Sequence, residues 1–214
     1  MKLLFITATN TNIGKTYTTL KLIETLVNRG ISVGVCKPIE TGVKSKAEDA
    51  STLLKCIKQH NSQFKNFTEK EITAYTFPLP ASPFCADTHQ IIKISHIKNK
   101  IQELSKLCEI LIVEGAGGLM VPITKDYMMI DLIQELKAKT LLVTSSKLGS
   151  INDTLLSIEA LKNRNIDFDW SVNLFEDKEH FKVVTQPFYN EVFPNWWSIQ
   201  EGLEGFVEEI LNCE

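Results

Sequence analysis

Residues 8–16 form a loop whose residue types suit the binding of phosphate groups. The loop lies between an apolar run at residues 3–6 and apolar residues at helical spacing, and it ends in Gly-Lys-Thr at residues 14–16. Backbone N–H groups at such a turn cradle phosphates, the lysine reaches the β and γ oxygens of a nucleoside triphosphate, and the threonine hydroxyl binds Mg2+. The first glycine of the usual motif is missing, because Ala8 and Thr9 occupy its two possible positions. A chance Gly-Lys-Thr at a helix start is the alternative.

Three charged side chains are candidates to act beside this loop. Lys37 ends a predicted strand, and Pro38 fixes the backbone that leaves it, so its ammonium should point toward the phosphate loop. Such a cation could neutralise a phosphoryl group in transfer, although a surface lysine is the alternative. Asp49 and Glu114 offer the hard oxygen ligands that suit Mg2+. Glu114 begins a Glu-Gly-Ala-Gly-Gly run that permits close approach to a ligand, whereas Asp49 could equally be a helix N-cap or a first-turn acid.

Other side chains of reactive types show no such arrangement. The four histidines have no metal-ligand spacing, and we expect them on the surface. The five cysteines are scattered without a Cys-X-X-Cys pair, so we expect reduced thiols, mostly buried. Trp196 and Trp197 could stack on a nucleotide base, but we expect them to fill the core or an interface. These histidines and cysteines are His60, His89, His96, His180, Cys36, Cys56, Cys85, Cys108 and Cys213.

Alternating strands and helices are predicted to hold the candidate groups. The strands are expected at residues 3–6, 31–36, 110–113, 140–144 and 168–174, and the helices from the phosphate loop to near Gly30, at 50–57, at 97–108 and after Ser150. Ser150 should cap that last helix, with Ile151, Leu155, Ile158 and Leu161 on its buried face. Proline-rich residues 78–83 should be extended, and the last forty or so residues lack a clear period.

This order predicts an α/β fold with a mostly parallel sheet, helices on both faces and one P-loop domain over residues 1–214, of the nucleotide hydrolase type. Continuous apolar runs such as residues 110–113 suit strands buried on both faces of such a sheet. Ligands bind at the carboxyl ends of its strands, where Lys37 and Glu114 stand.

Charge and hydropathy exclude two classes of partner. The net charge is -3 and no block of clustered Lys and Arg occurs, which argues against a general nucleic-acid binder. No apolar stretch has the length of a secretory signal or of a membrane-spanning helix. We therefore expect a cytoplasmic protein with no membrane partner.

Four motifs taken together resemble dethiobiotin synthetase, in the same order and at similar separations. They are residues 11–16, 36–42 (Cys-Lys-Pro-Ile-Glu-Thr-Gly), 113–118 (Val-Glu-Gly-Ala-Gly-Gly) and 147–152 (Lys-Leu-Gly-Ser-Ile-Asn), and the resemblance covers about the first 175 residues. That family has an elongated phosphate loop with five residues between its glycines, which accounts for the spacing here with Ala8 at the first position. The resemblance implies an ATP-dependent ligase of biotin synthesis. Such an enzyme carboxylates 7,8-diaminononanoate with CO2 and closes the ureido ring, giving dethiobiotin, ADP and phosphate.

The resemblance also implies roles for particular residues in a homodimer. Thr11, Lys15 and Lys37 would be catalytic, and Thr16, Asp49 and Glu114 would hold Mg2+. Thr41 would face the substrate, whose carboxylate would meet Ser150 and Asn152 of the other subunit. The ATP-binding residues implied are Asn12, Ile13, Gly14, Lys15, Thr16, Tyr17, Glu114, Gly117 and Asn173.

Two departures from the family limit this transfer. Ser82-Pro83-Phe84 stands where the family often has Ser-Pro-His, so a role of that histidine does not carry over. Asn173 matches an asparagine near the nucleotide base, but residues 174–177 lack the usual continuation, and we expect only modest discrimination between purine triphosphates.

Two competing functions use the same loop. A nucleotide-switch ATPase shares the fold, but such proteins often carry a second lysine early in the phosphate loop, where this chain has residues 9–11, Thr-Asn-Thr. Another amide-forming or ring-forming ligase commonly carries a glutamine-hydrolysing domain, for which 214 residues leave no room.

Overall fold

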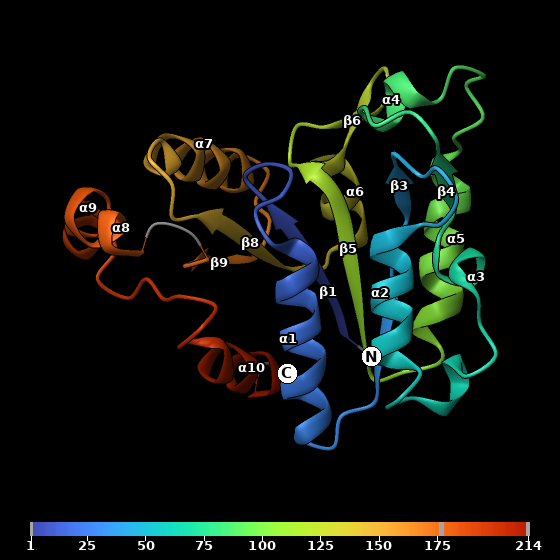
Figure 1. Ribbon diagram of the computed structural model, residues 1–214, viewed down its shortest axis with the longest axis horizontal. Helices are drawn as coiled ribbons and strands as arrows, with labels where there is room; N and C mark the ends of the chain where they lie inside the picture. Colours follow the sequence, from blue (N-terminus) through green and yellow to red (C-terminus); the bar gives the residue numbers. More distant parts are fainter. Residues whose placement is uncertain (1, 176–177, 213–214) are drawn as a thin grey trace.

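Five parallel strands form the central sheet of the computed structural model, which describes residues 2–175 and 178–212 (Figure 1). Their order across the sheet is β2-β5-β1-β8-β9, so β5 lies between β1, which leads into the phosphate loop, and β2, which leads into Lys37. Cys213 and the pair Glu176-Asp177, which entered the sequence predictions, lie outside the described residues. The strands are β1 (Lys2–Ala8), β2 (Val33–Cys36), β5 (Ile110–Gly118), β8 (Lys139–Ser145) and β9 (Phe168–Asn173).

The sheet confirms the mostly parallel architecture that continuous apolar runs predicted. β1 pairs with β5 on one side and with β8 on the other, and side chains of both β1 faces are buried from Leu4 onward. β5 is longer than predicted, because it continues through Glu114 to Gly118 instead of ending at Val113. The small residues after Glu114 allow this, since a Cβ on Gly118 would lie 3.0 Å from the Thr9 carbonyl oxygen.

Helices cover both faces of the sheet (Figure 1). α1 and α2 lie on one face together with α10, which packs against α1, while α5, α6 and α7 cover the other. Right-handed crossovers produce this division, because the chain moves in opposite directions along the sheet after β1 and after β5. The helices are α1 (Lys15–Asn28), α2 (Glu48–Ile57), α5 (Ile94–Ser105), α6 (Met129–Leu136), α7 (Ser150–Asn163) and α10 (Leu203–Asn212).

Short elements between β2 and β5 build the wall beside the carboxyl edge of the sheet. The proline-rich segment was predicted as extended, and it contains a helix, α4, because Pro83 is tolerated in its first turn and the Ser82 hydroxyl accepts from the Cys85 N–H. The short elements between β2 and β5 are β3 (Ile39–Thr41), η1 (Ser62–Phe64), α3 (Glu69–Ile72), β4 (Tyr75–Phe77) and α4 (Pro83–Ala86), and β6 (Pro122–Thr124) and β7 (Tyr127–Met128) follow β5.

The start of α7 differs from the prediction. Gly149, not Ser150, is the N-cap, because its φ of 93° lets the chain turn into the helix one residue earlier. Ser150 is consequently the first helical residue and is buried, and its N–H donates to the Lys147 carbonyl oxygen. The buried face includes Ser150 and Thr154, and Leu155, predicted on that face, is 37% exposed.

The C-terminal part forms helices although the apolar residues in its sequence do not recur at a clear helical spacing. Helices α8 (Lys178–Val184) and α9 (Gln186–Val192) are too short to show one, and α10 follows after an extended segment. Trp196 packs edge-on against Phe181 and Trp197 stacks on Phe206. Both tryptophans were predicted in the core or an interface, and both are half-buried and packed against the core.

Cysteines and histidines are distributed only partly as predicted. The four described cysteines are free thiols, but Cys36 alone is buried, Cys56 and Cys108 are half-buried and Cys85 is exposed, so the prediction of mostly buried thiols was wrong. All four histidines are exposed, as predicted. Among the described helices, none combines the length and the apolar character needed to cross a bilayer.

Candidate active site

The phosphate loop joins β1 to α1 and is held open by backbone geometry. Gly14 has a φ of 102°, and a Cβ there would lie 2.1 Å from the Asn173 amide nitrogen, so no other residue fits. The Lys15 ammonium donates to the Asn10 carbonyl oxygen at 3.0 Å, across the loop. The first N–H groups and the positive dipole end of α1 therefore face the space over the loop.

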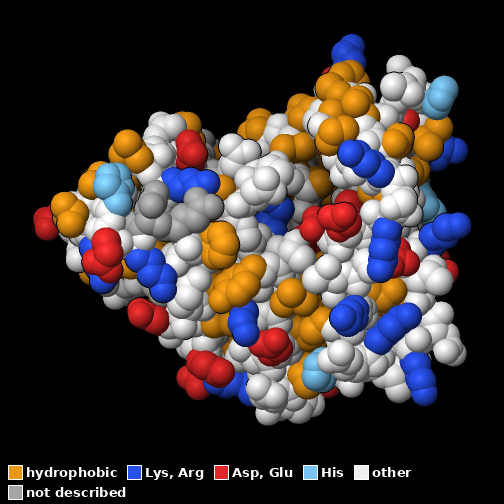
Figure 2. Space-filling model, in the orientation of Figure 1, with side chains coloured by type: hydrophobic (Ala, Val, Ile, Leu, Met, Phe, Trp, Pro, Cys, Tyr) orange, Lys and Arg blue, Asp and Glu red, His pale blue; other side chains and the backbone are white. Residues whose placement is uncertain are grey.

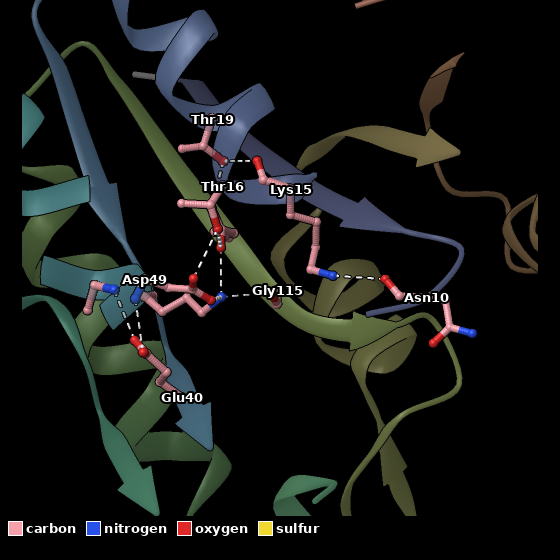
Figure 3. Close-up of polar contacts among 10 residues, drawn as sticks. Asn10, Lys15, Thr16, Thr19, Glu40, Asp49 and Gly115 are labelled. Atoms are coloured by element: carbon pink, nitrogen blue, oxygen red, sulfur yellow. Dashed lines mark hydrogen bonds and ion pairs between the residues drawn. The ribbon is translucent and has the colours of Figure 1, made fainter. Parts of the chain in front are cut away.

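Four side chains from separate elements meet at the carboxyl edge of the sheet beside this loop (Figure 3). The Lys37 ammonium lies 2.6 Å from Glu114 Oε1 and 2.7 Å from Asp49 Oδ2. The Thr16 hydroxyl lies 2.9 Å from Glu114 Oε1 and 3.2 Å from Asp49 Oδ1. Reasoning from strand ends had predicted Lys37 and Glu114 beside the phosphate loop, and the structure places both there.

Burial and charge pairing set the protonation of this cluster. Lys37 is 3% exposed, and its burial opposes the charge, but Glu114 and Asp49 outweigh that penalty and raise the pKa of Lys37. Burial by itself would raise the pKa of Asp49, but the charge of Lys37 and its hydrogen bond to Asp49 outweigh that effect, so the pKa of Asp49 is lowered. Lys15 has no comparable partner, and burial, followed by repulsion from Lys37, lowers the pKa of Lys15 to about 8.

Thr19 belongs to this cluster, although the sequence pattern had not marked it. Its hydroxyl lies 2.9 Å from Glu114 Oε2 and 3.0 Å from the Lys15 carbonyl oxygen. Thr16 and Thr19 are three residues apart in α1 and so share a face, and this face meets Glu114. That spacing, together with a carboxylate at the end of the neighbouring strand, was the available signal.

Glu40 is a second residue beside this cluster that the sequence pattern had not marked. Its two carboxylate oxygens accept from the N–H groups of Asp49 and Ala50, at 3.0 and 2.9 Å. It thereby caps α2, whose own N-cap residue, Ala47, has no side-chain acceptor. Asp49 is accordingly both a first-turn acid of α2 and a partner of Lys37, so the two readings of this residue are compatible.

A cleft of about 650 Å3 opens over the phosphate loop and Lys37. Figure 2 shows this face hollowed near its centre, between the region of α4 and β6 and the region of α7, with charged atoms at the hollow. Predicted residues in its lining are Thr11, Asn12, Gly14, Lys15, Thr16, Lys37, Thr41, Asp49 and Gly117. Residues 80–83, Glu40 and Val121 also line it, and the sequence pattern had not marked them as parts of a site.

The remaining predicted residues lie outside the lining of this cleft. Ser150 and Asn152 are at the start of α7, and Asn152 is exposed whereas Ser150 is buried. Tyr17 is 39% exposed on α1. Ile13 lies within the phosphate loop, and Asn173, at the end of β9, donates to its carbonyl oxygen at 2.9 Å.

The oxygen atoms that the site offers suit a hard divalent cation of the kind that also binds phosphate oxygens. Two carboxylates and one hydroxyl converge, from Asp49, Glu114 and Thr16. Within residues 2–175 and 178–212, no three His, Cys, Asp or Glu side chains form a metal cluster. Mg2+ commonly keeps water and phosphate ligands around one or two carboxylates, so this arrangement suits it.

Several known proteins are similar to this chain in sequence. A family model described as an AAA domain matches residues 2–169. The ATP-dependent dethiobiotin synthetase BioD of Sulfurovum sp. (strain NBC37-1) is 60% identical over 98% of this chain and 100% of its own length. That of Wolinella succinogenes is 37% identical over the full length of both chains. The similarity therefore extends past residue 175, beyond the range that the motifs had indicated.

Solved structures show the same fold at much lower identity. The MinC:MinD cell division protein complex of Aquifex aeolicus matches with a TM-score of 0.55 and 15% identity, over 98% of this chain and 86% of that one. A ParA family ATPase from Chlorobium tepidum matches with a TM-score of 0.52 and 12% identity, over 99% and 94%. These matches support the P-loop fold and carry no information on the reaction.

Proposed function

Because this chain belongs to the ATP-dependent dethiobiotin synthetase family, we propose that its cleft carboxylates 7,8-diaminononanoate and closes the ureido ring through a carbamate and a phosphorylated carbamate. The chain is an ATP-dependent ligase of biotin biosynthesis, with ATP as co-substrate. The observation that carries the mechanistic proposal is the Lys37 ammonium, which is buried between two carboxylates at the floor of the cleft and beside the phosphate loop.

The proposed reaction needs no protein nucleophile. One amine nitrogen of the substrate attacks CO2 and loses a proton, which gives a carbamate. A carbamate oxygen attacks the γ-phosphorus of ATP, and the bond to ADP breaks. The second amine then attacks the carbonyl carbon, phosphate leaves with the electrons of the C–O bond, and the amine proton passes to solvent. The protein therefore has to position two anions and stabilise charge.

The residues in the cleft are suited to that task. Lys15 and the N–H groups at the start of α1 would bind the β- and γ-phosphates. Lys37 would neutralise the oxygens that gain charge as the phosphoryl group transfers, and Thr11 and Thr41 would donate hydrogen bonds to the carbamate or the amines. Thr16, Asp49 and Glu114 would hold Mg2+, which supplies further charge neutralisation at the phosphate oxygens.

The nucleotide site would extend beyond the cleft lining. Asn12, Ile13, Gly14 and Gly117 would contact phosphates through backbone groups, and Tyr17 and Asn173 would border the nucleoside. We place all of these roles in a single P-loop domain spanning residues 1–214 of a cytoplasmic enzyme.

Product analysis tests the proposed function. The protein is incubated with the diamine, bicarbonate, Mg2+ and ATP, and mass spectrometry should detect dethiobiotin together with equal amounts of ADP and phosphate. Bicarbonate labelled with carbon-13 should place one labelled carbon in the product. Release of ADP without dethiobiotin would contradict the proposal and favour an ATPase.

The start of α7 motivates a homodimer with shared sites. The N–H groups and the positive dipole end at a helix start suit an anion, but this segment does not line the cleft of its own chain. We propose that it receives the substrate carboxylate in the cleft of a second subunit. Asn152→Ala should then raise the KM of the diamine about tenfold, because a hydrogen bond to a charged group is lost, with the KM of ATP unchanged. Steady-state kinetics with each substrate varied checks both values.

Mixing two inactive variants tests the shared site directly. Lys15→Ala removes the phosphate lysine, and Asn152→Trp blocks the start of α7 without disturbing the buried Ser150. Random pairing makes about half of the dimers heterodimers, each with one intact site, so the mixture should recover about a quarter of the wild-type activity. If subunit exchange is confirmed and the mixture stays inactive, each subunit builds its own site.

The low pKa of Lys15 predicts a proton linkage. In the free protein Lys15 is neutral above about pH 8, whereas bound phosphates favour its charged form. At about pH 9, ATP binding should therefore take up close to one proton, and affinity should fall as pH rises further. Calorimetry in buffers of different ionisation enthalpy measures this uptake, and Lys15→Met should abolish it. Unchanged proton uptake in that variant would assign the linkage to another group.

A further inference from the structure

Two side-chain amides connect the C-terminal segment to the phosphate loop. The Leu174 N–H donates to Gln200 Oε1 at 3.0 Å, and Gln200 Nε2 donates to Asn173 Oδ1 at 2.8 Å. Asn173 Nδ2 in turn donates to the Ile13 carbonyl oxygen at 2.9 Å. The chain of hydrogen bonds thus runs from one backbone group to another, across residues far apart in the sequence.

The two backbone ends fix the orientation of both amides. A backbone N–H can only donate, so Gln200 must turn its oxygen toward Leu174 and its nitrogen toward Asn173. A carbonyl can only accept, so Asn173 must turn its nitrogen toward Ile13 and its oxygen toward Gln200. Rotating either amide by a half-turn would place two donors or two acceptors opposite each other at both of its contacts.

Pairing of the C-terminal segment with β9 holds Gln200 in place. The Val172 N–H donates to the Trp197 carbonyl oxygen, and the Ile199 N–H donates to the Val172 carbonyl oxygen, each at 3.0 Å. A turn follows at once, because the Gly202 N–H donates to the Ser198 carbonyl oxygen at 2.8 Å. Gln200 therefore stands on an ordered backbone although it is exposed itself.

The hydrogen bond from Asn173 to the Ile13 carbonyl affects phosphate binding because the peptide bond between Ile13 and Gly14 is planar. The bond between Ile13 and Gly14 is trans, so the Ile13 carbonyl and the Gly14 N–H point in opposite directions. Holding the carbonyl consequently sets the direction of the N–H of Gly14, which lines the cleft. Asn173 also occupies the space that a Gly14 side chain would need.

We infer that Gln200 is a positioning residue of the nucleotide site, which acts by orienting the Asn173 amide and thereby the Ile13–Gly14 peptide over the phosphates. The inference rests on the proposed role of this loop in ATP binding. It assigns to the C-terminal segment a part in binding the nucleotide diphosphate group. Gln200 itself contacts neither the cleft nor Ile13.

Gln200→Glu separates this role from a structural one. A glutamate at position 200 can still accept from the Leu174 N–H. If Gln200 only anchored the C-terminal segment, this substitution would therefore leave ADP binding unchanged. The second oxygen of the glutamate would face Asn173 Oδ1, so the hydrogen bond is lost and the Asn173 amide is driven away from its orientation toward Ile13. Loss of one or two hydrogen bonds predicts that the Kd for ADP with Mg2+ rises about tenfold. Calorimetry on the full chain measures it.

Gln200→Glu also adds a negative charge, which could weaken ADP binding directly. A double-mutant cycle with Asn173→Ala distinguishes that direct effect from an effect that acts through Asn173. If Gln200 acts through Asn173, Gln200→Glu should raise the Kd by less than about twofold in the Asn173→Ala background. An equal rise in both backgrounds, or no rise in the wild-type background, overturns the inference. The melting temperature of each variant shows whether it is folded. Because ADP binding is read without turnover, failure of this cycle is distinguishable from failure to form dethiobiotin.

Discussion

Lys37→Met should lower kcat by about 10²- to 10³-fold and change the KM of ATP only a few-fold, since a fixed charge aimed at a transition state is worth that much. Methionine keeps the length and apolar stem of lysine but removes the ammonium. In the structure this ammonium touches Glu114 and Asp49, and Lys37 lines the cleft in which the carbamate and the γ-phosphate would meet. Its charge is needed most when the phosphoryl group transfers.

Lys15→Met is the matched comparison. Lys15 lies within the phosphate loop, so its loss should weaken nucleotide binding as well as turnover. The Kd for ADP, measured by calorimetry, should rise in Lys15→Met and stay near the wild-type value in Lys37→Met. Turnover of Lys37→Met equal to that of the wild type would refute the catalytic role of this lysine.

Stability must be measured alongside these rates, because Lys37 is buried with its partners. Without the ammonium, the fully buried Glu114 carboxylate loses its counter-charge, and breaking such a pair typically costs about 3–5 kcal/mol. Mg2+ can replace the lost charge if Asp49 and Glu114 bind it. The melting temperature of Lys37→Met should therefore depend on Mg2+ more strongly than that of the wild type, and kcat should be compared at saturating Mg2+.

Glu114→Gln should abolish most activity while the fold persists. The amide oxygen can still accept from Lys37 and Thr16. Its nitrogen would face the Thr19 hydroxyl, which can accept that hydrogen bond and direct its own proton to the Lys15 carbonyl oxygen at 3.0 Å. The geometry is thus kept, but one of two carboxylates for Mg2+ is lost, so we expect kcat to fall about 10²-fold or more.

The dependence on Mg2+ identifies the cause of that loss. Half-maximal activity of Glu114→Gln should require at least about tenfold more Mg2+ than in the wild type, as one charged ligand is missing. Glu109→Gln is the matched control, because Glu109 precedes the opposite end of β5 and accepts from the Ser32 N–H. It should leave activity and the Mg2+ requirement unchanged. An unaltered Mg2+ requirement in Glu114→Gln would remove this carboxylate from the metal site.

The order of strands and helices along the chain, and the main charged groups of the site, could be predicted from the sequence. Continuous apolar runs identify strands buried on both faces, and the carboxyl ends of such strands meet at one edge. That rule alone placed Lys37 and Glu114 near the phosphate loop. The rule worked because it depends on local residue types and on the handedness of the connections, which the chain order determines.

Contacts between distant polar side chains were decided only by the tertiary structure. Glu40 accepts from the Asp49 N–H because a short strand approaches the start of α2, and no local pattern encodes that approach. Helical spacing places Thr19 on the same face as Thr16, but only the packing of α1 against β5 brings that face to Glu114. The C-terminal segment illustrates the same point, since its short helices show no period, yet its pairing with β9 brings Gln200 to Asn173. Residue type and period determine which face of an element is buried, whereas the position of one polar group against another depends on register and loop path.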